Sequence, residues 1–387
     1  MRGGGLLLRV VVGVVIPLSG GVHAVAQSHS LVEHIHHTSA TDYTRVIIAL
    51  SGETSHQIFT IPGDPAQNLS PRIVVDFSPA KRSNKMPLAL PVHDGLLTWI
   101  RTGQFSSTTV RVLLDVEHLD DYKAFMLPSP QRLIIDIRGK GQQAAARQSE
   151  PSPARRYRIM LDPGHGGHDP GALGVSGIAE KDAVLAISRR VGRKLATRLA
   201  VDVLFTRTTD IFIPLEERTA RANAAKADLF ISIHANASTN RDLQGVETYY
   251  LNNTNNRATI RLAAMENGLF KGVRKSTDES GLSYILSDLI QAGKEEESIS
   301  LAHYLQEGIV SRARTHYPAV RNLGVKKGPF YVLVGAHMPC VLVEVAFISH
   351  RVEGKHLISP DYQEVLAEGL FLGIVRFLRT ELMVKNL

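Results

Sequence analysis

Three segments of the sequence carry the residues best suited to chemistry. His165 lies in a Gly/Pro-rich turn that follows the apolar run 159–161, and Glu180 opens a helical pattern shortly afterwards. His234 lies where a second apolar run ends. Two imidazoles and one carboxylate form a known catalytic zinc set, which leaves a fourth position for water. The three segments therefore predict a divalent-metal site, with zinc favoured over other ions that accept nitrogen and oxygen ligands.

Each of these residues also has an ordinary structural explanation. His165 could cap a turn, Glu180 could favour the positive end of a helix, and His234 could be a satisfied core histidine. In open α/β sheets, however, ligands bind beyond the carboxyl ends of strands, and both histidines follow such ends. Taken jointly, with the glycines around them, the three side chains favour a metal site.

A fourth acidic residue, Glu344, lies within the nearly continuous apolar stretch 341–349. A carboxylate in a buried strand costs several kcal/mol unless it is paired or used. One interpretation is a salt bridge to a buried arginine. The other is a general base whose pKa is tuned by burial and by the nearby metal. Because three candidate ligands are already present, we favour the general base.

The elements that must position these residues follow residue 156. Strand-like and helical patterns alternate there, which is typical of an α/β domain with a mostly parallel sheet. The expected elements are a strand at 157–161, a helix at 180–199, a strand at 201–206, a helix at 215–227 and a strand at 229–234. Further strands are expected at 245–251 and 340–348, and a long closing helix at 359–382.

The region before this domain, residues 31–139, is rich in short β-branched runs separated by turns, which predicts an all-β domain. The runs 72–77 and 132–137 share the pattern Arg, three apolar residues, Asp and one apolar residue, so two related half-sheets are expected. Residues 140–156 gather Gly, Gln, Ser, Pro and Arg, as linkers do.

Composition excludes several classes of protein. A chain of 387 residues exceeds one ordinary domain, and 44% hydrophobic residues argue against wholesale disorder. The single cysteine, Cys340, excludes an internal disulfide, a cysteine zinc cluster and an Fe–S site. Cys340 precedes a buried strand without an obvious activating base, so we interpret it as an apolar filler rather than a nucleophile. The net charge of +7 suits an anionic polymer, but no nucleic-acid recognition motif accompanies it.

Residues 1–26 predict a secretory signal peptide. Arg2 and Arg9 supply the positive charge, an apolar run follows, and Ala24 and Ala26 form a small-x-small cleavage site. The alternative is a membrane anchor, but the uninterrupted apolar stretch is short for a span of about 30 Å. We therefore expect export and no membrane span after cleavage.

The motifs LDPGHGGHDPGA, GIAEKD, TRTTD, ERTARAN, SIHANA, GVETYYL and VLVEVAFIS follow one another in residues 157–387. Their order and spacing resemble the catalytic domain of the zinc-dependent N-acetylmuramoyl-L-alanine amidases (the amidase-3 family). Residues 31–139 resemble the AMIN module, a peptidoglycan-binding and septum-targeting domain. Together the two parts resemble the bacterial cell-division amidases.

This resemblance implies roles for individual residues. It makes His165, Glu180 and His234 the ligands of one Zn²⁺ and Glu344 the catalytic carboxylate. The implied reaction hydrolyses the amide between the lactyl group of N-acetylmuramic acid and the L-Ala of the stem peptide in peptidoglycan. The implied setting is the periplasm, at the division septum, where the enzyme would separate daughter cells.

Residues 252–302 form a long insert with helical periodicity at 257–267 and 283–291. It could be a simple surface elaboration. The resemblance implies instead a regulatory helix that plugs the zinc cleft, with Glu266 as its blocking carboxylate. Release would then come from an activator, a degenerate LytM-domain protein.

Two further functions stay open on the sequence. The chain could be a zinc peptidase that cuts within the stem peptide, or a non-catalytic wall-binding scaffold of the division machinery. Arg207 and Arg218 could orient substrate carboxylates or pair with nearby acids.

Overall fold

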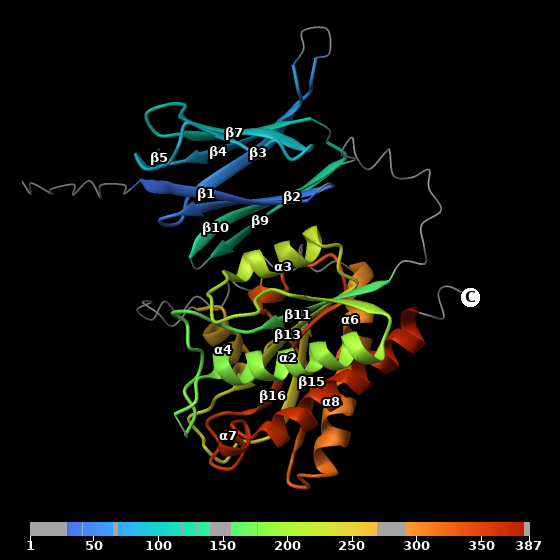
Figure 1. Cartoon of the computed structure of the whole chain (residues 1–387). Helices are drawn as coiled ribbons and strands as arrows, with labels where there is room; N and C mark the ends of the chain where they lie inside the picture. The colour runs from blue at the N-terminus through green and yellow to red at the C-terminus, as the bar shows by residue number, and fades with distance from the viewer. Residues whose placement is uncertain are drawn as a thin grey trace, which may run out of the picture.

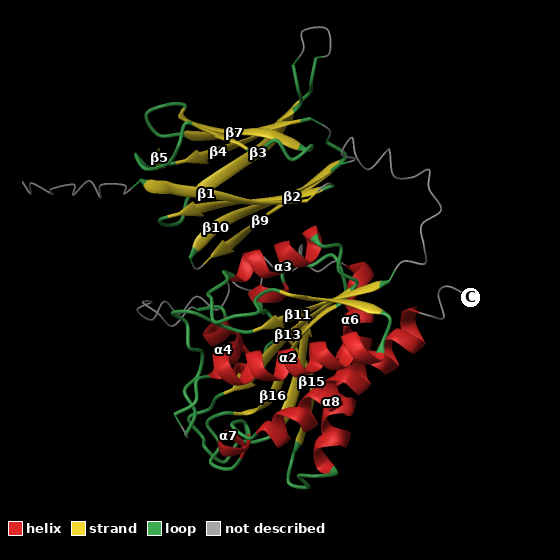
Figure 2. Cartoon of the chain, viewed as in Figure 1, coloured by secondary structure: helices red, strands yellow, loops and turns green. Residues whose placement is uncertain are grey.

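The computed structural model describes residues 29–40, 42–64, 69–117, 119–128, 130–139, 156–175, 177–268 and 292–382. The expected signal peptide, most of the expected linker and the second helical pattern of the insert lie outside these residues. Figure 1 shows an all-β domain, drawn blue to green, above an α/β domain drawn green to red. Among the residues that the structure describes, helices are confined to the second domain (Figure 2). None of the described helices is long and apolar enough to cross a membrane.

The N-terminal domain consists of two five-stranded sheets packed face to face. The first sheet contains, in order, β5 (Ala80–Arg82), β1 (Ser30–Ala40), β2 (Tyr43–Leu50), β10 (Gln131–Arg138) and β9 (Asp121–Pro128). The second contains β3 (Ser55–Ile61), β4 (Arg72–Ser78), β8 (Val110–Val116), β7 (Leu97–Gln104) and β6 (Ala89–Pro91). The repeated Arg-to-Asp pattern lies on β4 and β10, one strand in each sheet, as the sequence predicts.

Apolar side chains that alternate along these strands form the core between the two sheets. Val46 and Ile48 of β2 point inward, as do Leu133 and Ile135 of β10, and they meet Val75 and its neighbours from the second sheet. This alternation is what a half-buried strand requires.

The C-terminal domain is built on one six-stranded sheet, which is parallel except where β14 runs antiparallel to β16. Its strands, in order, are β12 (Val201–Phe205), β11 (Tyr157–Pro163), β13 (Leu229–Asn236), β16 (Cys340–Phe347), β14 (Val246–Leu251) and β15 (Asn322–Gly328). The mostly parallel sheet confirms the expected fold class. The edge strand β15 was not foreseen.

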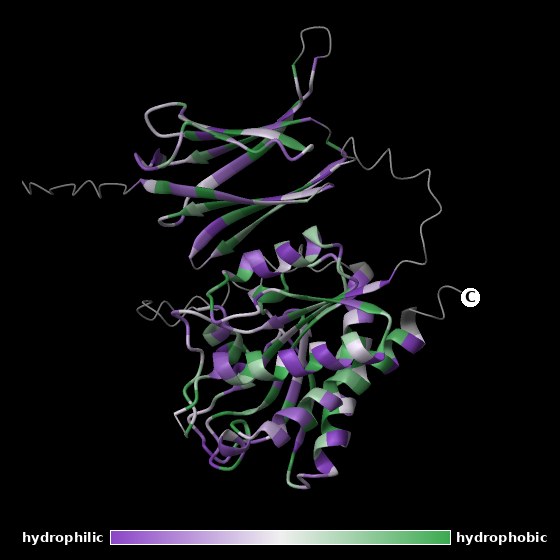
Figure 3. Cartoon of the chain, in the orientation of Figure 1, coloured by the Kyte–Doolittle hydropathy of each residue, from purple (hydrophilic) through white to green (hydrophobic). Residues whose placement is uncertain are grey.

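Helices cover both faces of this sheet. One face packs against α2 (Glu180–Arg198), α6 (Ala292–Arg314) and α8 (Pro360–Phe377), which continues into the π-helical turn η3 (Leu378–Leu382). The other face carries α3 (Leu215–Ala224), α4 (Arg257–Glu266) and the 3-10 turn η2 (Tyr331–Leu333). The short helix α7 (Glu353–His356) follows β16. In Figure 3, hydrophobic and hydrophilic residues are interspersed along these helices, as expected for helices with one buried side.

Candidate metal centre

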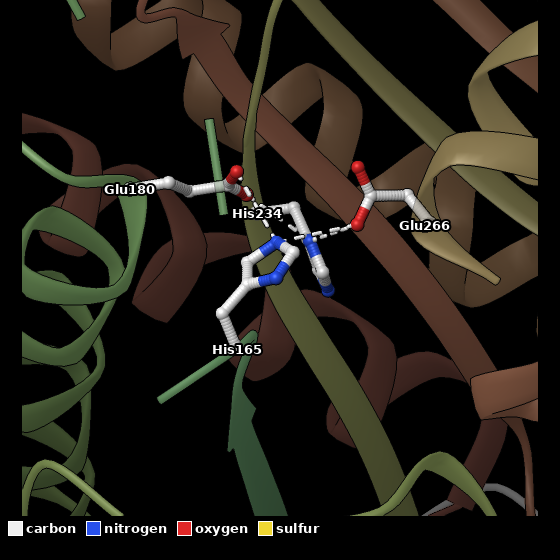
Figure 4. A group of neighbouring side chains, drawn as sticks. All are labelled: His165, Glu180, His234 and Glu266. Carbon is white, nitrogen blue, oxygen red and sulfur yellow. Dashed lines mark hydrogen bonds and ion pairs between the residues drawn. The ribbon is translucent and has the colours of Figure 1, made fainter. Parts of the chain in front are cut away.

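Four side chains converge at the carboxyl edge of the central strands (Figure 4). They are His165, which follows β11, Glu180 at the start of α2, His234 on β13 and Glu266 at the end of α4, and their ligand atoms all lie within 4.8 Å of one another. His165 Nε2 lies 3.2 Å from Glu180 Oε2 and 3.3 Å from Glu266 Oε2. His234 Nδ1 lies 3.1 Å from Glu180 Oε1 and 3.0 Å from Glu266 Oε2. The structure thus brings the three predicted ligands together with the predicted blocking residue.

The donor set fits a zinc ion. Four ligands about 2.05 Å from a tetrahedral zinc lie roughly 3.3 Å from one another, close to these nitrogen–oxygen separations. His165 Nε2 and Glu266 Oε2 are buried, yet neither makes a hydrogen bond with a described residue. Both atoms instead face other members of the cluster, including one another at 3.3 Å, and a bound cation explains why buried nitrogen and oxygen atoms point at one another there.

The turn after β11 fixes how His165 faces this cluster. His165 itself has a left-handed backbone (φ 58°), which is uncommon for a residue with a side chain and is typical of functional sites. Its Nδ1–H donates to Asp169 Oδ2 at 2.9 Å, which leaves Nε2 as the metal-facing atom. Close approach also requires Gly171, because a Cβ there would lie 2.6 Å from Glu180 Oε2 and from His165 Cδ2.

Glu180 is held as a carboxylate by its surroundings. Its two oxygens accept hydrogen bonds from the backbone N–H groups of Ala172 and Ala235, each at 2.9 Å. Burial alone would raise the pKa of Glu180, but the neighbouring His165 and His234 hold it well below its ordinary value. Its position at a helix N-terminus therefore explains only part of its environment.

Glu344 lies beside the cluster on β16. The register of the sheet pairs Glu344 with His234, so the two side chains lie on the same face of adjacent strands. Glu344 is fully buried, and neither of its oxygens forms a hydrogen bond with a described residue. Burial, followed by the negative charge of Glu266, raises its pKa well above the ordinary value. No described arginine pairs with Glu344, so the structure gives no support to the salt-bridge interpretation.

Arg207 and Arg218 both hold the turn that carries His165. Arg207 donates to the carbonyls of Pro163 at 3.0 Å and Gly164 at 2.7 Å. Arg218 pairs with the buried Asp162 at 2.9 Å and donates to the carbonyl of His165 at 2.8 Å. Arg218 therefore pairs with a nearby acid, as one of the two alternatives had it, whereas Arg207 donates to backbone carbonyls rather than to acids.

Cys340 takes no part in this cluster. It is buried at the amino end of β16, four residues before Glu344, and hence about 13 Å away along the strand. Burial raises the pKa of its thiol to about 12, which disfavours the nucleophilic thiolate.

A cavity of about 410 Å³ borders His165, His234 and Glu266. One part of its lining comes from the C-terminal domain, including the exposed ring of Phe212. The remainder comes from the N-terminal domain, namely from Glu33, His34, Ala49, Leu50, Pro130, Gln131 and Arg132.

Comparisons with known proteins identify the family of this chain. The N-acetylmuramoyl-L-alanine amidase family matches residues 159–376, and the AMIN domain matches residues 34–137. The amidase AmiC of Neisseria meningitidis serogroup B is 29% identical, over 89% of this chain and 89% of that protein. AmiC of Escherichia coli O6:H1 is 30% identical, over 87% of this chain and 86% of that protein. The chain therefore belongs to the N-acetylmuramoyl-L-alanine amidase family, with an N-terminal AMIN domain.

Solved structures resemble the C-terminal part of the chain. An N-acetylmuramoyl-L-alanine amidase from Clostridium difficile 630 matches with 30% identity and a TM-score of 0.45, covering 59% of this chain and 100% of that one. The amidase AmiC2 of Nostoc punctiforme matches with 30% identity and a TM-score of 0.44, covering 59% and 99%.

Proposed function

We propose that this chain is a zinc-dependent amidase that separates stem peptides from the glycan strands of peptidoglycan. The bond cleaved is the amide between the lactyl group of N-acetylmuramic acid and L-Ala, and the biological role is splitting of the septum. The observation that carries the proposal is the convergence of His165, Glu180 and His234 beside the buried, unpartnered Glu344. Full-length similarity to two AmiC amidases supports it.

Each residue of the cluster has a distinct task in this proposal. His165 Nε2, His234 Nδ1 and Glu180 would hold the zinc, while Asp169 orients the ring of His165. Zinc supplies Lewis-acid catalysis at the scissile carbonyl and lowers the pKa of water when bound. Glu344 removes a proton from the attacking water and later delivers it to the leaving amine of L-Ala.

The low-polarity surroundings of Glu344 suit this proton transfer. Burial makes its carboxylate a stronger base than an exposed glutamate, because the charged form is poorly solvated. Its position one strand away from His234 places it beside the proposed metal rather than among its ligands. A base so placed can reach a water that attacks the carbonyl carbon.

The resting form of the enzyme is proposed to be blocked by Glu266. Glu266 Oε2 lies 3.0 Å from His234 Nδ1 and 3.3 Å from His165 Nε2, where a water or a substrate oxygen must otherwise bind. The next residue, Asn267, fixes the end of α4: it donates to the carbonyl of Pro329 at 2.9 Å and accepts from the backbone N–H of Tyr331 at 2.8 Å. Displacement of α4 by the proposed LytM-domain activator would open the site.

The proposed substrate places the enzyme at the cell wall. The signal-peptide pattern of residues 1–26 supports export to the periplasm, and recruitment to the septum is proposed for the AMIN domain. Determination of the N-terminus of the protein purified from the periplasm tests this, with cleavage near Ala26 expected.

The function is tested with purified sacculi and the full chain carrying Glu266→Ala, with and without a chelator. An amidase releases intact stem peptides, and chelation abolishes the release until zinc is restored. A zinc peptidase would release fragments of the stem instead, and a scaffold would release nothing. Either of these results would contradict the proposal.

A further inference from the structure

The first sheet of the AMIN domain has an apolar outer face that the amidase domain covers. Ile47 of β2, Phe125 and Leu127 of β9 and Ile134 of β10 are buried against Tyr331 and Val334 of the amidase domain. They alternate with the residues that point into the AMIN core. Sheets that face water carry polar residues on that side, so this face is built to be covered.

A buried arginine crosses the same boundary. Arg45 of β2 is fully buried and forms a two-point ion pair with Asp136 of β10, at 2.6 and 2.7 Å. Its remaining hydrogen bonds go to the amidase domain: to the carbonyl of Glu216 at 2.9 Å, to Thr219 Oγ1 at 2.8 Å and to the carbonyl of Gly335 at 3.1 Å. Because a buried charge is destabilising unless its hydrogen bonds are satisfied, the amidase domain completes the environment of Arg45.

In the second sheet of the AMIN domain, the arginines and aspartates of two adjacent strands pair with one another. In β4 and β8, the register places Arg72 opposite Asp115 and Asp76 opposite Arg111. Each arginine pairs with the acid that it faces, at 2.8 and 2.7 Å. Arg72 and Arg111 are therefore both satisfied by acids of the same domain.

The first sheet of the AMIN domain, which contacts the amidase domain, repeats this arrangement but lacks one of the two acids. In β10 and β2, Asp136 faces Arg45 and pairs with it, but Arg132 faces Ala49. The acid that Arg132 lacks is supplied by the amidase domain: Glu216 of α3 forms the ion pair, and each side chain is 9% exposed. The site of Arg132 is thus incomplete without the second domain.

This junction lies directly on the cavity that leads to the metal cluster. Arg132 and Glu216 both line that cavity, together with His165, His234 and Glu266. Figure 1 shows α3 between the first AMIN sheet and the rest of the amidase domain, so the same helix holds the AMIN domain and borders the cavity.

We infer that the AMIN domain is a fixed wall of the active-site cavity, held by the Arg132–Glu216 pair, and that this wall binds the muramoyl-peptide part of the substrate. The inference rests on the proposed function for the identity of that ligand. The wall offers the polar side chains of His34, Glu33 and Gln131 to hydroxyl and amide groups. From the amidase domain, the exposed residue Phe212, whose ring packs against that of His168, offers aromatic surface to an apolar sugar face.

The test uses the full chain with Glu266→Ala as parent and compares it with the same chain carrying Arg132→Glu. The added charge faces Glu216, so the domains separate and the radius of gyration in small-angle scattering increases. The Kd and the KM for a soluble N-acetylmuramoyl tetrapeptide then rise roughly tenfold, which corresponds to about 1.4 kcal/mol, while kcat stays near the parent value.

Two further variants control for misfolding. Arg132→Glu combined with Glu216→Arg recreates the pair with reversed charges and is expected to restore both the compact shape and the Kd. Arg72→Glu makes the same change at the matched position of the second sheet, whose partner lies within the AMIN domain, and leaves both values unchanged. Ile134→Glu separates the domains through the apolar contact, independently of the ion pair.

The possible outcomes are distinct. If the domains separate and the Kd for the muramoyl tetrapeptide is unchanged, the AMIN domain does not contribute to substrate binding, and the inference is wrong. Unchanged scattering in both Arg132→Glu and Ile134→Glu would contradict the docking. If the parent binds the compound but does not hydrolyse it, the proposed function fails while the Kd comparison still decides this inference.

Discussion

Glu344 carries the proton transfer in this account, although it makes no polar contact with any described residue. Its strand is apolar throughout, so its carboxylate has no structural purpose that the surrounding residues reveal. A buried carboxylate retained beside a cluster of ligands is typical of a catalytic base. Its role is therefore best separated from that of the ligands by a substitution that keeps its shape.

Glu344→Gln is expected to lower kcat by roughly 10²- to 10⁴-fold, the usual contribution of a general base. Zinc content is expected to stay near one ion per chain, because Glu344 is not among the clustered ligands. Metal analysis and hydrolysis of a muramoyl peptide check this in the Glu266→Ala chain. Glu217→Gln, in the first turn of α3, serves as control. Retained activity in Glu344→Gln would show that Glu344 is not the general base.

At the scale of single residues, the sequence indicated which side chains meet but not what holds them. His165, Glu180 and His234 were expected at one crevice because two of them follow strand ends. The support from Asp169 was not foreseen, since it depends on the left-handed backbone at His165. The packing of Arg207 beneath the turn is likewise a tertiary contact without a local signal.

Helix α4 is the element on which the proposed regulation depends. It is only 10 residues long, and its amino end is capped by Asn256, whose side chain accepts from the N–H groups of Ala258 and Thr259. Its other end is fixed by the two hydrogen bonds of Asn267 to residues 329 and 331. Leu262 and Ala263 also pack α4 against the sheet, so an activator that displaces the helix must overcome this contact as well as the hydrogen bonds at its ends.

Asn267→Ala is expected to raise the basal activity of the otherwise unchanged chain by up to about 30-fold, which corresponds to about 2 kcal/mol. The substitution removes two buried hydrogen bonds, each with a net contribution of roughly 1 kcal/mol, and so raises the population in which Glu266 leaves the cluster. Release of stem peptides from sacculi measures the change. Asn240→Ala, in an exposed loop, is the matched control. If the activity of Asn267→Ala equals that of the parent, α4 is not the element that blocks the site.

At the scale of elements, the alternation of strand and helix predicted most of the amidase domain. Boundaries differ where local signals were weak: α3 ends at Ala224 rather than at 227, and α8 gives way to a π-helical turn at Leu378. Ser359 is the N-cap of α8, but its side chain makes no capping hydrogen bond, so the proline after it defines the start. The strand β15 carries two glycines and two lysines, which are uncommon in strands, so its sequence does not predict a strand.

In the whole molecule, the two domains share a buried ionic and apolar boundary rather than only a linker. The sequence carries a signal for this boundary. The runs 46–50 and 132–137 are apolar almost throughout, whereas a strand with one face in water alternates. The sequence does not reveal what covers the outer side of these two strands, because the contact with α3 joins residues far apart in the chain.

The boundary also predicts a pH dependence of stability. Burial alone would raise the pKa of Asp136, but Arg45 lowers it from 3.8 to about 2. A lowered folded-state pKa stabilises the protein above the unfolded value, and this contribution of about 2 kcal/mol is lost as the pH falls from about 4 to about 2. Unfolding of the wild type and of Asp136→Asn across this range checks it. The substituted chain is expected to show a smaller pH slope, and equal slopes would contradict the assignment.

The most direct test of the central claim locates the oxygen that hydrolysis adds. The Glu266→Ala chain with zinc is incubated with peptidoglycan in ¹⁸O-labelled water, and the products are analysed by mass spectrometry. Hydrolysis of the proposed amide places one ¹⁸O in the lactyl carboxylate of the muramoyl sugar, and the stem peptide leaves unlabelled with a free L-Ala amine. Label in a carboxylate within the stem peptide, or no labelled product at all, would contradict the account.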